Sequence, residues 1–431
     1  MICNNLGINS KGHLTFAGQD TIELAEKYGT PLYLLDEEKV REKMSIYFKA
    51  MKENFGESSM PLYASKALCF KKIYCIAAEE NMGIDVVSPG ELYTALKAGF
   101  PMEYVYFHGN NKTESDIKFA IESKVGYFVC DNLDELDTID STASNFGIIQ
   151  KILLRLTPGI DPHTHAKIST GKVDSKFGIA IETGQAKEAI KIALGKKNIK
   201  LCGYHCHIGS QTFDIKPFVD GTEIMLNFIA HIKDSLGYEA QILNLGGGMG
   251  VRYIEEHPEI DYSKNIKGIA DRMKKKCSEL GIKLPVILME PGRSIVADAG
   301  MTLYTVGGTK EIPGYKNYVS IDGGMTDNPR YTLYESPYTI MLANRATEIP
   351  EKKYAVGGRC CESGDIIQED VMLPSAKKGD ILAVMTTGAY NYSMASNYNR
   401  IPRPPIVMLN NGESYIAVKR ESYADLMIND L

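Results

Sequence analysis

Short apolar, β-branched segments recur along the first two thirds of the chain, and helical patterns lie between most of them. The segments that predict strands are Pro61–Ser65, Ile84–Ser88, Tyr104–His108, Tyr127–Asp131, Ile152–Leu156, Leu201–His207, Ile242–Leu245 and Val286–Glu290. The clearest predicted helices are Glu91–Ala98, Gln185–Leu194, Ile224–Leu236 and Ile266–Leu280. Near-continuous apolar strands that alternate with helices are typical of a parallel sheet with a covered outer face. Because eight such strands close a TIM-type barrel, the pattern predicts an α/β fold with a (β/α)8 barrel.

Polar residues gather near the C-terminal ends of these predicted strands. They are Lys66, Asp85, His108, Arg155, His207, Gly246–Gly248 and Glu290. In barrels of this kind the active site lies at the rim that the C-terminal strand ends form. A lone lysine at a strand end would be a solvated cap, but the other polar residues at neighbouring strand ends predict a functional rim.

The last third of the chain has a different character. Strand-like runs are separated by turns rich in Gly and Pro, and they are Thr302–Val306, Tyr318–Ile321, Tyr354–Val356, Ile381–Met385, Ile406–Leu409 and Ser414–Val418. Asn411-Gly412, between the last two runs, is a strong hairpin signal. This part of the chain therefore predicts a second, antiparallel β-domain.

Composition narrows the class of protein. The 431 residues are enough for two domains with sizeable cores. A formal net charge of -6 gives no support for nucleic-acid binding. No apolar run approaches the roughly 18 residues that a membrane span needs, and the N-terminal residues lack a basic-then-apolar secretion signal. Nine scattered cysteines suit a reducing compartment, so we expect a cytoplasmic protein without a nucleic-acid or membrane partner.

The run Cys202-Gly-Tyr-His205-Cys206-His207 contains the residue types of a metal site. Its ligand types alternate along one predicted strand, so His205 and His207 share a face and Cys206 points away. Zinc sites prefer paired ligands on turns together with a second pair, which His163 and His165 could supply. The alternating pattern disfavours zinc, and we expect no metal.

Several motifs, taken together and in order, carry a resemblance to a known family. They are Tyr63-Ala-Ser-Lys66-Ala, His207-Ile-Gly-Ser210-Gln, Asn244-Leu-Gly-Gly-Gly248, Glu290-Pro-Gly-Arg293, Cys361-Glu-Ser363 and Gly388-Ala-Tyr390. The chain resembles the alanine-racemase-like (fold type III) decarboxylases that use pyridoxal 5'-phosphate, and within them the diaminopimelate decarboxylase family. Leu68 departs from the Asn that this family usually has. The resemblance implies a barrel over residues 36–290 and a discontinuous β-domain formed by residues 1–35 and 291–431.

The resemblance also implies a cofactor site. Lys66 would form the Schiff base with pyridoxal phosphate, His207 would stack on its ring, and Glu290 would pair with the pyridine nitrogen. A carboxylate there keeps that nitrogen protonated and favours decarboxylation over racemisation. Glycine backbone can cradle a phosphate. The full expected cofactor set is Lys66, His207, Ser210, Gly247, Gly248, Glu290, Gly292, Arg293 and Tyr390.

The expected substrate site extends into the β-domain. Arg293, Arg330 and Tyr334 would clamp a carboxylate, because guanidinium groups bind carboxylates bidentately. Glu362 would bind the distal ammonium of the substrate. By the resemblance, Tyr390 would contact both the cofactor phosphate and the substrate. Cys361, the expected proton donor, would reach a neighbouring subunit's site, which implies a homodimer with shared active sites. Lys66, His207 and Cys361 form the expected catalytic set, and whether Cys360 shares the role of Cys361 stays open.

The implied activity is decarboxylation of meso-2,6-diaminopimelate to L-lysine and carbon dioxide, the last step of lysine biosynthesis. A decarboxylase for ornithine, lysine, arginine or carboxynorspermidine is the alternative. An amino-acid racemase is disfavoured by Glu290, and a small pyridoxal-phosphate-binding protein would lack the β-domain. The polar segment Asp161–Lys176 has a length compatible with a lid.

Overall fold

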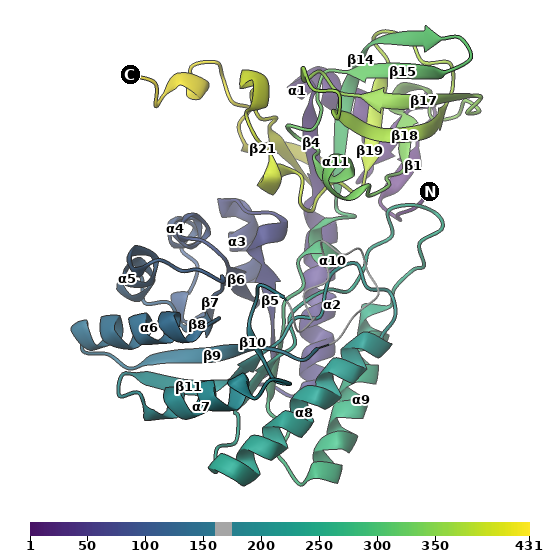
Figure 1. The fold of residues 1–431 in the computed structure, drawn as a ribbon. Helices are drawn as coiled ribbons and strands as arrows, with labels where there is room; N and C mark the ends of the chain where they lie inside the picture. The colour runs from purple at the N-terminus through teal and green to yellow at the C-terminus, as the bar shows by residue number, and fades with distance from the viewer. Residues whose placement is uncertain (160–174) are drawn as a thin grey trace. The chain divides into compact units, whose positions relative to one another are not determined.

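The computed structural model describes residues 1–159 and 175–431 (Figure 1). Its contacts divide the chain into a barrel unit (Lys43–Gly250 and Ile260–Gly292) and a β unit (Met1–Glu42, Val251–Glu259 and Arg293–Leu431). This division differs from the expected ranges, because residues 36–42 and Val251–Glu259 fall in the β unit and residues 291–292 in the barrel unit. The lid-length segment and the histidines at 163 and 165 lie outside the described residues, apart from Ser175 and Lys176.

Eight parallel strands close the barrel. In ring order they are β9 (Gln150–Thr157), β11 (Ile199–His205), β12 (Ile242–Asn244), β13 (Val286–Met289), β5 (Met60–Ala64), β6 (Gly83–Val86), β7 (Val105–Phe107) and β8 (Tyr127–Cys130). The pairing of β8 with β9 completes the ring, and the short β10 (Ile179–Ala180) adds to β9. All eight predicted strands and the barrel are thereby confirmed, with bounds that shift by at most two residues.

Helices follow most barrel strands. They are α3 (Lys71–Glu79), α4 (Pro89–Ala98), α5 (Glu114–Glu122), α6 (Leu133–Asn145), α7 (Gln185–Gly195), α8 (Lys216–Leu236) and α9 (Tyr262–Leu280), while α2 (Glu37–Phe55) contains the division between the units. The start of α4 shows the local logic, since Ser88 accepts from the Glu91 N–H and Pro89 takes the first turn. Gly99, at φ +72°, ends that helix. The four predicted helices are confirmed.

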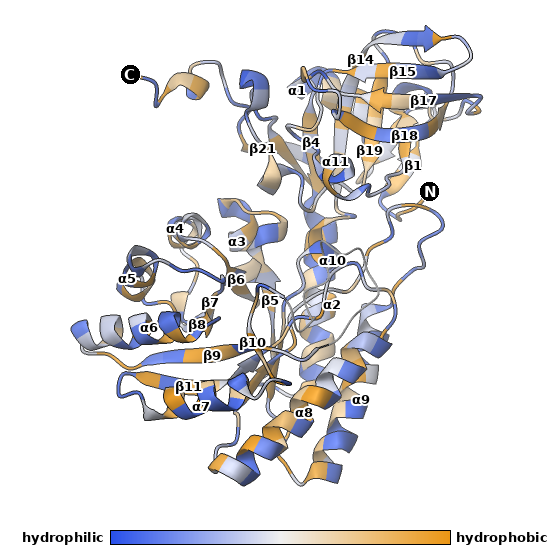
Figure 2. Ribbon diagram, in the orientation of Figure 1, coloured by the Kyte–Doolittle hydropathy of each residue, from blue (hydrophilic) through white to orange (hydrophobic). Residues whose placement is uncertain are grey.

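The barrel interior is packed by one side chain from each of several strands. These are Leu62, Tyr106, Val129, Leu153, Cys202 and Leu288. Figure 2 shows hydrophobic residues along strands of the barrel, whereas α8 and α9 alternate hydrophobic and hydrophilic positions. That contrast is expected when strands are buried on both faces and helices on one. In the described part of the chain, no helix combines the length and the apolar character that a membrane crossing requires.

The β unit holds two sheets. Its strands are β1 (Leu6–Ile8), β2 (Leu14–Phe16), β3 (Gln19–Asp20), β4 (Leu32–Asp36), β14 (Gly300–Ile312), β15 (Lys316–Ile321), β16 (Ile340–Leu342), β17 (Lys352–Gly357), β18 (Ile366–Leu373), β19 (Ile381–Met385), β20 (Ile406–Asn410) and β21 (Glu413–Val418). Short helices α1 (Thr21–Tyr28), α10 (Arg293–Val296) and α11 (Arg330–Tyr334) complete it. The predicted hairpin is confirmed, with Asn411 and Gly412 both at positive φ between β20 and β21.

The prediction of an antiparallel β-domain is wrong in one respect, because the larger sheet is mixed. β4 pairs with β20 in parallel, and so does β15 with β17. Neither pair is joined by a tight turn, and only strands joined by a short hairpin must run antiparallel. β4 comes from the N-terminal segment and lies between β14 and β20 in the larger sheet, whereas β1–β3 form the smaller sheet.

Candidate active site

A cavity of about 360 Å³ opens at the C-terminal ends of the barrel strands. Its walls are formed by Lys66, Val87, His108, Gly109, Asn110, Arg155, Phe177, His205, His207 and Glu290. The predicted rim residues in this set lie within a barrel strand or within two residues of its C-terminal end, as the rim prediction requires. Five of the rim residues named from sequence therefore meet at one cavity, whereas Asp85 lies behind Lys66.

Lys66 sits in a single 3-10 turn (Ser65–Ala67) that follows β5. Its Nζ lies 2.7 Å from Oδ2 of Asp85, which belongs to β6. The Lys66 side chain is 40% exposed and Asp85 is fully buried. Asp85 thus holds the amine beside the cavity while leaving it accessible.

Glu290 follows β13 and is the acid that lines the described part of the cavity. His108 Nε2 lies 2.8 Å from Oε1, His205 Nε2 lies 3.3 Å from Oε2, and Asn244 Nδ2 donates to Oε1 at 2.7 Å. Burial by itself would raise the pKa of Glu290, but His108 and His205 outweigh it and hold that pKa well below its usual range. The surroundings of Glu290 thus favour the carboxylate form of this buried side chain.

Burial lowers the pKa of His205 to about 4. A neutral imidazole still donates from Nε2, so His205 remains a partner of Glu290. His108, His205 and Glu290 also have the residue types of a metal-ligand set, with ligand atoms within 4.8 Å of one another. Here both Nε2 atoms lie against the carboxylate, His205 in a hydrogen bond and His108 at a distance of 2.8 Å, so the group is accounted for without a metal ion. The sequence drew attention to His205 as a metal ligand and missed this role.

His207 lines the same cavity and touches the glycine loop. A Cβ added to Gly246 would lie 2.7 Å from its Nδ1. Burial, helped by the Lys66 and Arg155 cations, holds the pKa of His207 well below its usual range. A neutral ring of this kind can stack on a flat ligand.

The loop after β12 approaches the loop that carries Ser210. Thr212 N–H donates to Gly248 O at 3.0 Å, and a Cβ at Gly248, whose φ is +121°, would lie 2.2 Å from Gly209 O. Among the residues that the structure describes, nothing accepts from the backbone N–H of Gly247 or Gly248. Two consecutive available donors beside a hydroxyl suit a phosphate. Gly292 packs on the Lys66 turn, where a Cβ would lie 2.9 Å from that of Ala64.

The β unit contains a second group, which we call the arginine group: Arg293, Arg330, Tyr253, Tyr338 and Tyr390. Arg293 and Arg330 are buried, at 8% and 4% exposed. Arg293 donates to Tyr253 OH at 2.8 Å and its guanidinium carbon lies 4.7 Å from the Tyr390 ring centre. Arg330 donates to Tyr338 OH at 3.1 Å and lies 4.4 Å from the Tyr253 ring centre. The two expected clamp arginines thus share one aromatic setting.

Tyr334, the tyrosine expected beside Arg330, ends the same short helix and is half-buried. The tyrosines that hold the arginines, Tyr253 and Tyr338, were not found from the sequence, because they approach only in three dimensions. Among the residues that the structure describes, Arg330 makes no ion pair, since its hydrogen-bond partners are hydroxyl groups. A buried cation without an acid is suited to an anionic ligand.

Cys361 and Glu362 lie on an exposed turn of the β unit. The adjacent Cys360 is buried, and its N–H donates to Asp365 Oδ2 at 2.7 Å. Burial raises the pKa of Cys360 to about 11. The structure therefore separates two cysteines that the sequence could not, since only Cys361 is accessible.

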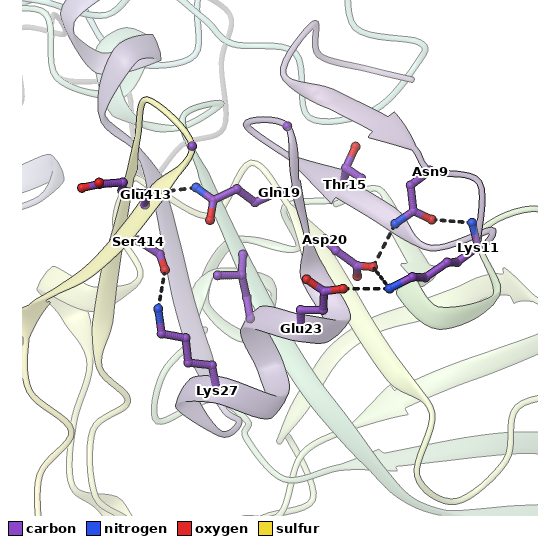
Figure 3. Close-up of a pocket in the computed structure, with 12 residues that line it drawn as sticks. Asn9, Lys11, Thr15, Gln19, Asp20, Glu23, Lys27, Glu413 and Ser414 are labelled. Atoms are coloured by element: carbon purple, nitrogen blue, oxygen red, sulfur yellow. Dashed lines mark hydrogen bonds and ion pairs between the residues drawn. The ribbon is translucent and has the colours of Figure 1, made fainter.

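A larger groove of about 770 Å³ lies elsewhere in the β unit (Figure 3). Lys11 pairs with Glu23 at 2.7 Å, Lys27 donates to Ser414 at 3.0 Å, and Gln19 donates to the Glu413 carbonyl at 2.9 Å. Its polar groups thus satisfy one another and join the N-terminal segment to the last hairpin. Size alone does not make it a reaction site.

The barrel, the accessible lysine beside its cavity, the ionised buried carboxylate and the adjacent backbone donors together define a pyridoxal-phosphate enzyme of the barrel class. The family model "Pyridoxal-dependent decarboxylase, pyridoxal binding domain" matches residues 38–297.

The diaminopimelate decarboxylase of Bacillus methanolicus is 49% identical over 414 residues, which cover 96% of each chain. That of Bacillus subtilis (strain 168) is 46% identical, covering 98% of this chain and 96% of the relative. A solved diaminopimelate decarboxylase from M. jannaschii, in co-complex with L-lysine, has a TM-score of 0.90 at 36% identity, covering 99% and 98% of the two chains. The chain belongs to the diaminopimelate decarboxylase family of pyridoxal-dependent decarboxylases.

Proposed function

We propose that this protein decarboxylates meso-2,6-diaminopimelate to L-lysine and carbon dioxide with pyridoxal phosphate, as the last step of lysine biosynthesis. The names of its relatives and the L-lysine in a solved one support this activity. The observation that carries the substrate is the buried Arg330, which makes no ion pair with any described residue. The substrate of a diamine-forming decarboxylase has no distal carboxylate that could bind Arg330.

The cofactor site follows from the barrel cavity. Lys66 would hold the cofactor covalently, His207 would cover a ring face, and Glu290 would pair with the ring nitrogen. The phosphate would take the N–H groups of Gly247 and Gly248. We add Ser210, Gly292, Arg293 and Tyr390 to this set. When bound, the cofactor accepts the electrons of the bond to the departing carboxylate.

The substrate's far end would be read in the β unit. Arg293, Arg330 and Tyr334, with Tyr390, would hold the distal carboxylate, and Glu362 would hold the distal ammonium. Cys361 would return a proton to the carbon that lost carbon dioxide, and Lys66 could do so as well.

We infer a homodimer with shared active sites. Cys361 and Glu362 are exposed in the β unit, and neither lines the barrel cavity. A cysteine of this kind can serve a neighbouring copy's cavity. Nine free cysteines support a reducing, cytoplasmic location.

The test is a product assay with added pyridoxal phosphate. Meso-diaminopimelate, ornithine, arginine, lysine and carboxynorspermidine are supplied separately, and carbon dioxide and the amine product are quantified. Lysine from diaminopimelate alone is the expected result, whereas a diamine from ornithine or lysine would refute the carboxylate pocket. The homodimer is tested by measuring sedimentation and activity on the same sample, and a fully active monomer would contradict it.

Lysine/ornithine decarboxylase from Vibrio vulnificus, at 24% identity and a TM-score of 0.75, shows the shared fold alone.

A further inference from the structure

Behind the barrel rim lies a fully buried ion pair that the proposed chemistry does not use. Lys112 Nζ lies 2.7 Å from Oε1 of Glu135, and both side chains are only 2% exposed. Lys112 lies in the loop between β7 and α5, and Glu135 lies in the first turn of α6. Burial raises the pKa of Glu135 against the opposing pull of Lys112.

The Lys112 ammonium also binds backbone. It donates to Gly109 O and to Val129 O, each at 2.9 Å, in addition to Glu135. An ammonium has three N–H donors, so all three are used. Gly109 follows β7 and Val129 belongs to β8, which means that one side chain ties together two neighbouring strand ends.

The tied segment forms part of the cavity wall. Gly109 and Asn110 line the cavity, and the Asn110 carbonyl accepts from Asn132, the N-cap of α6, at 3.4 Å. His108, directly before Gly109, meets Glu290 at 2.8 Å. The peptide after His108 is thus held from α6, on the side away from the cavity.

We propose that Lys112 and Glu135 are positioning residues for the cofactor site: they fix the segment 108–110 so that the His108 ring stays against the Glu290 carboxylate. This inference rests on the proposed use of pyridoxal phosphate. Neither residue reaches the cavity. They act through His108, which sets the direction of the carboxylate that would face the ring nitrogen.

Stability alone does not require this pair. Taking two charges out of water costs several kcal/mol, and an apolar pair of similar volume is often as stable or more so. What an apolar pair cannot supply is the two hydrogen bonds to Gly109 and Val129. The double variant Lys112→Met/Glu135→Leu therefore separates positioning from stability.

The experiment removes the cofactor from the purified protein and retitrates it with pyridoxal phosphate, while unfolding of the cofactor-free protein is followed separately. We expect the double variant to stay folded, with some loss of stability from the two carbonyls left unpaired, and to bind the cofactor about tenfold or more weakly. Glu135→Gln, which keeps the shape and weakens the anchor, should lower the affinity about threefold.

Gln150 provides the matched control at the opposite barrel end. Its side-chain amide donates to Val125 O and Gly126 O, at 3.4 and 3.3 Å, so Gln150→Leu also removes a buried tie between neighbouring strands. That variant should lose stability and keep its cofactor affinity within about twofold. Parent-like affinity in Glu135→Gln, or in a folded double variant, overturns the inference, as does equal weakening in Gln150→Leu. A parent protein that binds no cofactor would instead refute the proposed function.

Discussion

The barrel cavity and the arginine group differ in the partners that the chain itself provides for a buried charge. In the barrel, the Glu290 carboxylate is bonded to His205 and Asn244 and lies 2.8 Å from His108 Nε2, so its partners all come from the chain itself. In the β unit, Arg330 is as deeply buried but meets only hydroxyl groups and aromatic faces. In the barrel the buried acid is surrounded by groups of the chain itself, whereas the β unit retains a buried cation without a described acid.

This difference indicates which region is built in advance and which is completed by its ligand. A buried charge that lacks a partner is costly, and a ligand carboxylate would remove that cost on binding. The barrel should therefore set the chemistry, and the β unit should set which substrate is accepted. Substitutions in the two regions should then fall on different kinetic constants.

The largest effect is expected at Lys66. Among the described residues of the cavity wall Lys66 is the only lysine, so Lys66→Ala should lower turnover by at least about 10³-fold because covalent catalysis is lost. Turnover is measured at saturating substrate and cofactor. Lys97→Ala, an exposed lysine of α4, is the control and should keep full activity. If Lys66→Ala kept activity within about tenfold of the parent, the loss would be too small for a missing nucleophile. The barrel cavity would then not be where the reaction takes place.

Glu290→Gln is expected to be next. It preserves the size of the side chain but removes the negative charge that His108 and His205 surround. Because that charge would act on the ring nitrogen, kcat should fall about 10²-fold with little change in KM for the substrate. Glu279→Gln, on the exposed face of α9, is the control. A rise in KM at unchanged kcat would reassign Glu290 to substrate binding.

The sequence predicted the barrel more completely than the β unit, and the reason is physical. Barrel strands are apolar on both faces and each follows its neighbour along the chain, so local pattern is sufficient. Strand direction in the β unit depends on pairs such as β4 with β20, whose partners lie at opposite ends of the chain. Local pattern carries no information on such long-range pairing.

The same distinction separates the site residues. Lys66 and Glu290 stand at strand ends, where the barrel itself brings them to one cavity. Tyr253 and Tyr338 reach the arginines only through tertiary packing, so no spacing in the sequence revealed them. The different exposure of Cys360 and Cys361 is likewise a property of the folded turn.

Arg330→Met tests the β-unit side of the comparison. A hydrogen-bonded charge pair with the distal carboxylate would be lost, so KM for diaminopimelate should rise about 10- to 100-fold with kcat reduced much less. Arg330→Lys should recover little, because a point charge does not reproduce bidentate binding. Arg400→Met, an exposed arginine of the same unit, serves as the control. An unchanged KM would show that the arginine group is structural.

The smallest effect is expected at the two adjacent cysteines. Cys361→Ser should lower kcat about tenfold, at the mild end for a proton donor, because Lys66 can also return a proton. Cys360→Ser should leave kcat within about twofold, since that side chain is buried away from the surface and its thiol is held protonated. Thiol labelling gives an independent measurement: Cys361 should react well before Cys360, whose pKa burial raises to about 11. If Cys360→Ser were instead the slower enzyme, the exposed turn would not deliver the proton, and the inferred sharing of sites between subunits would lose its basis.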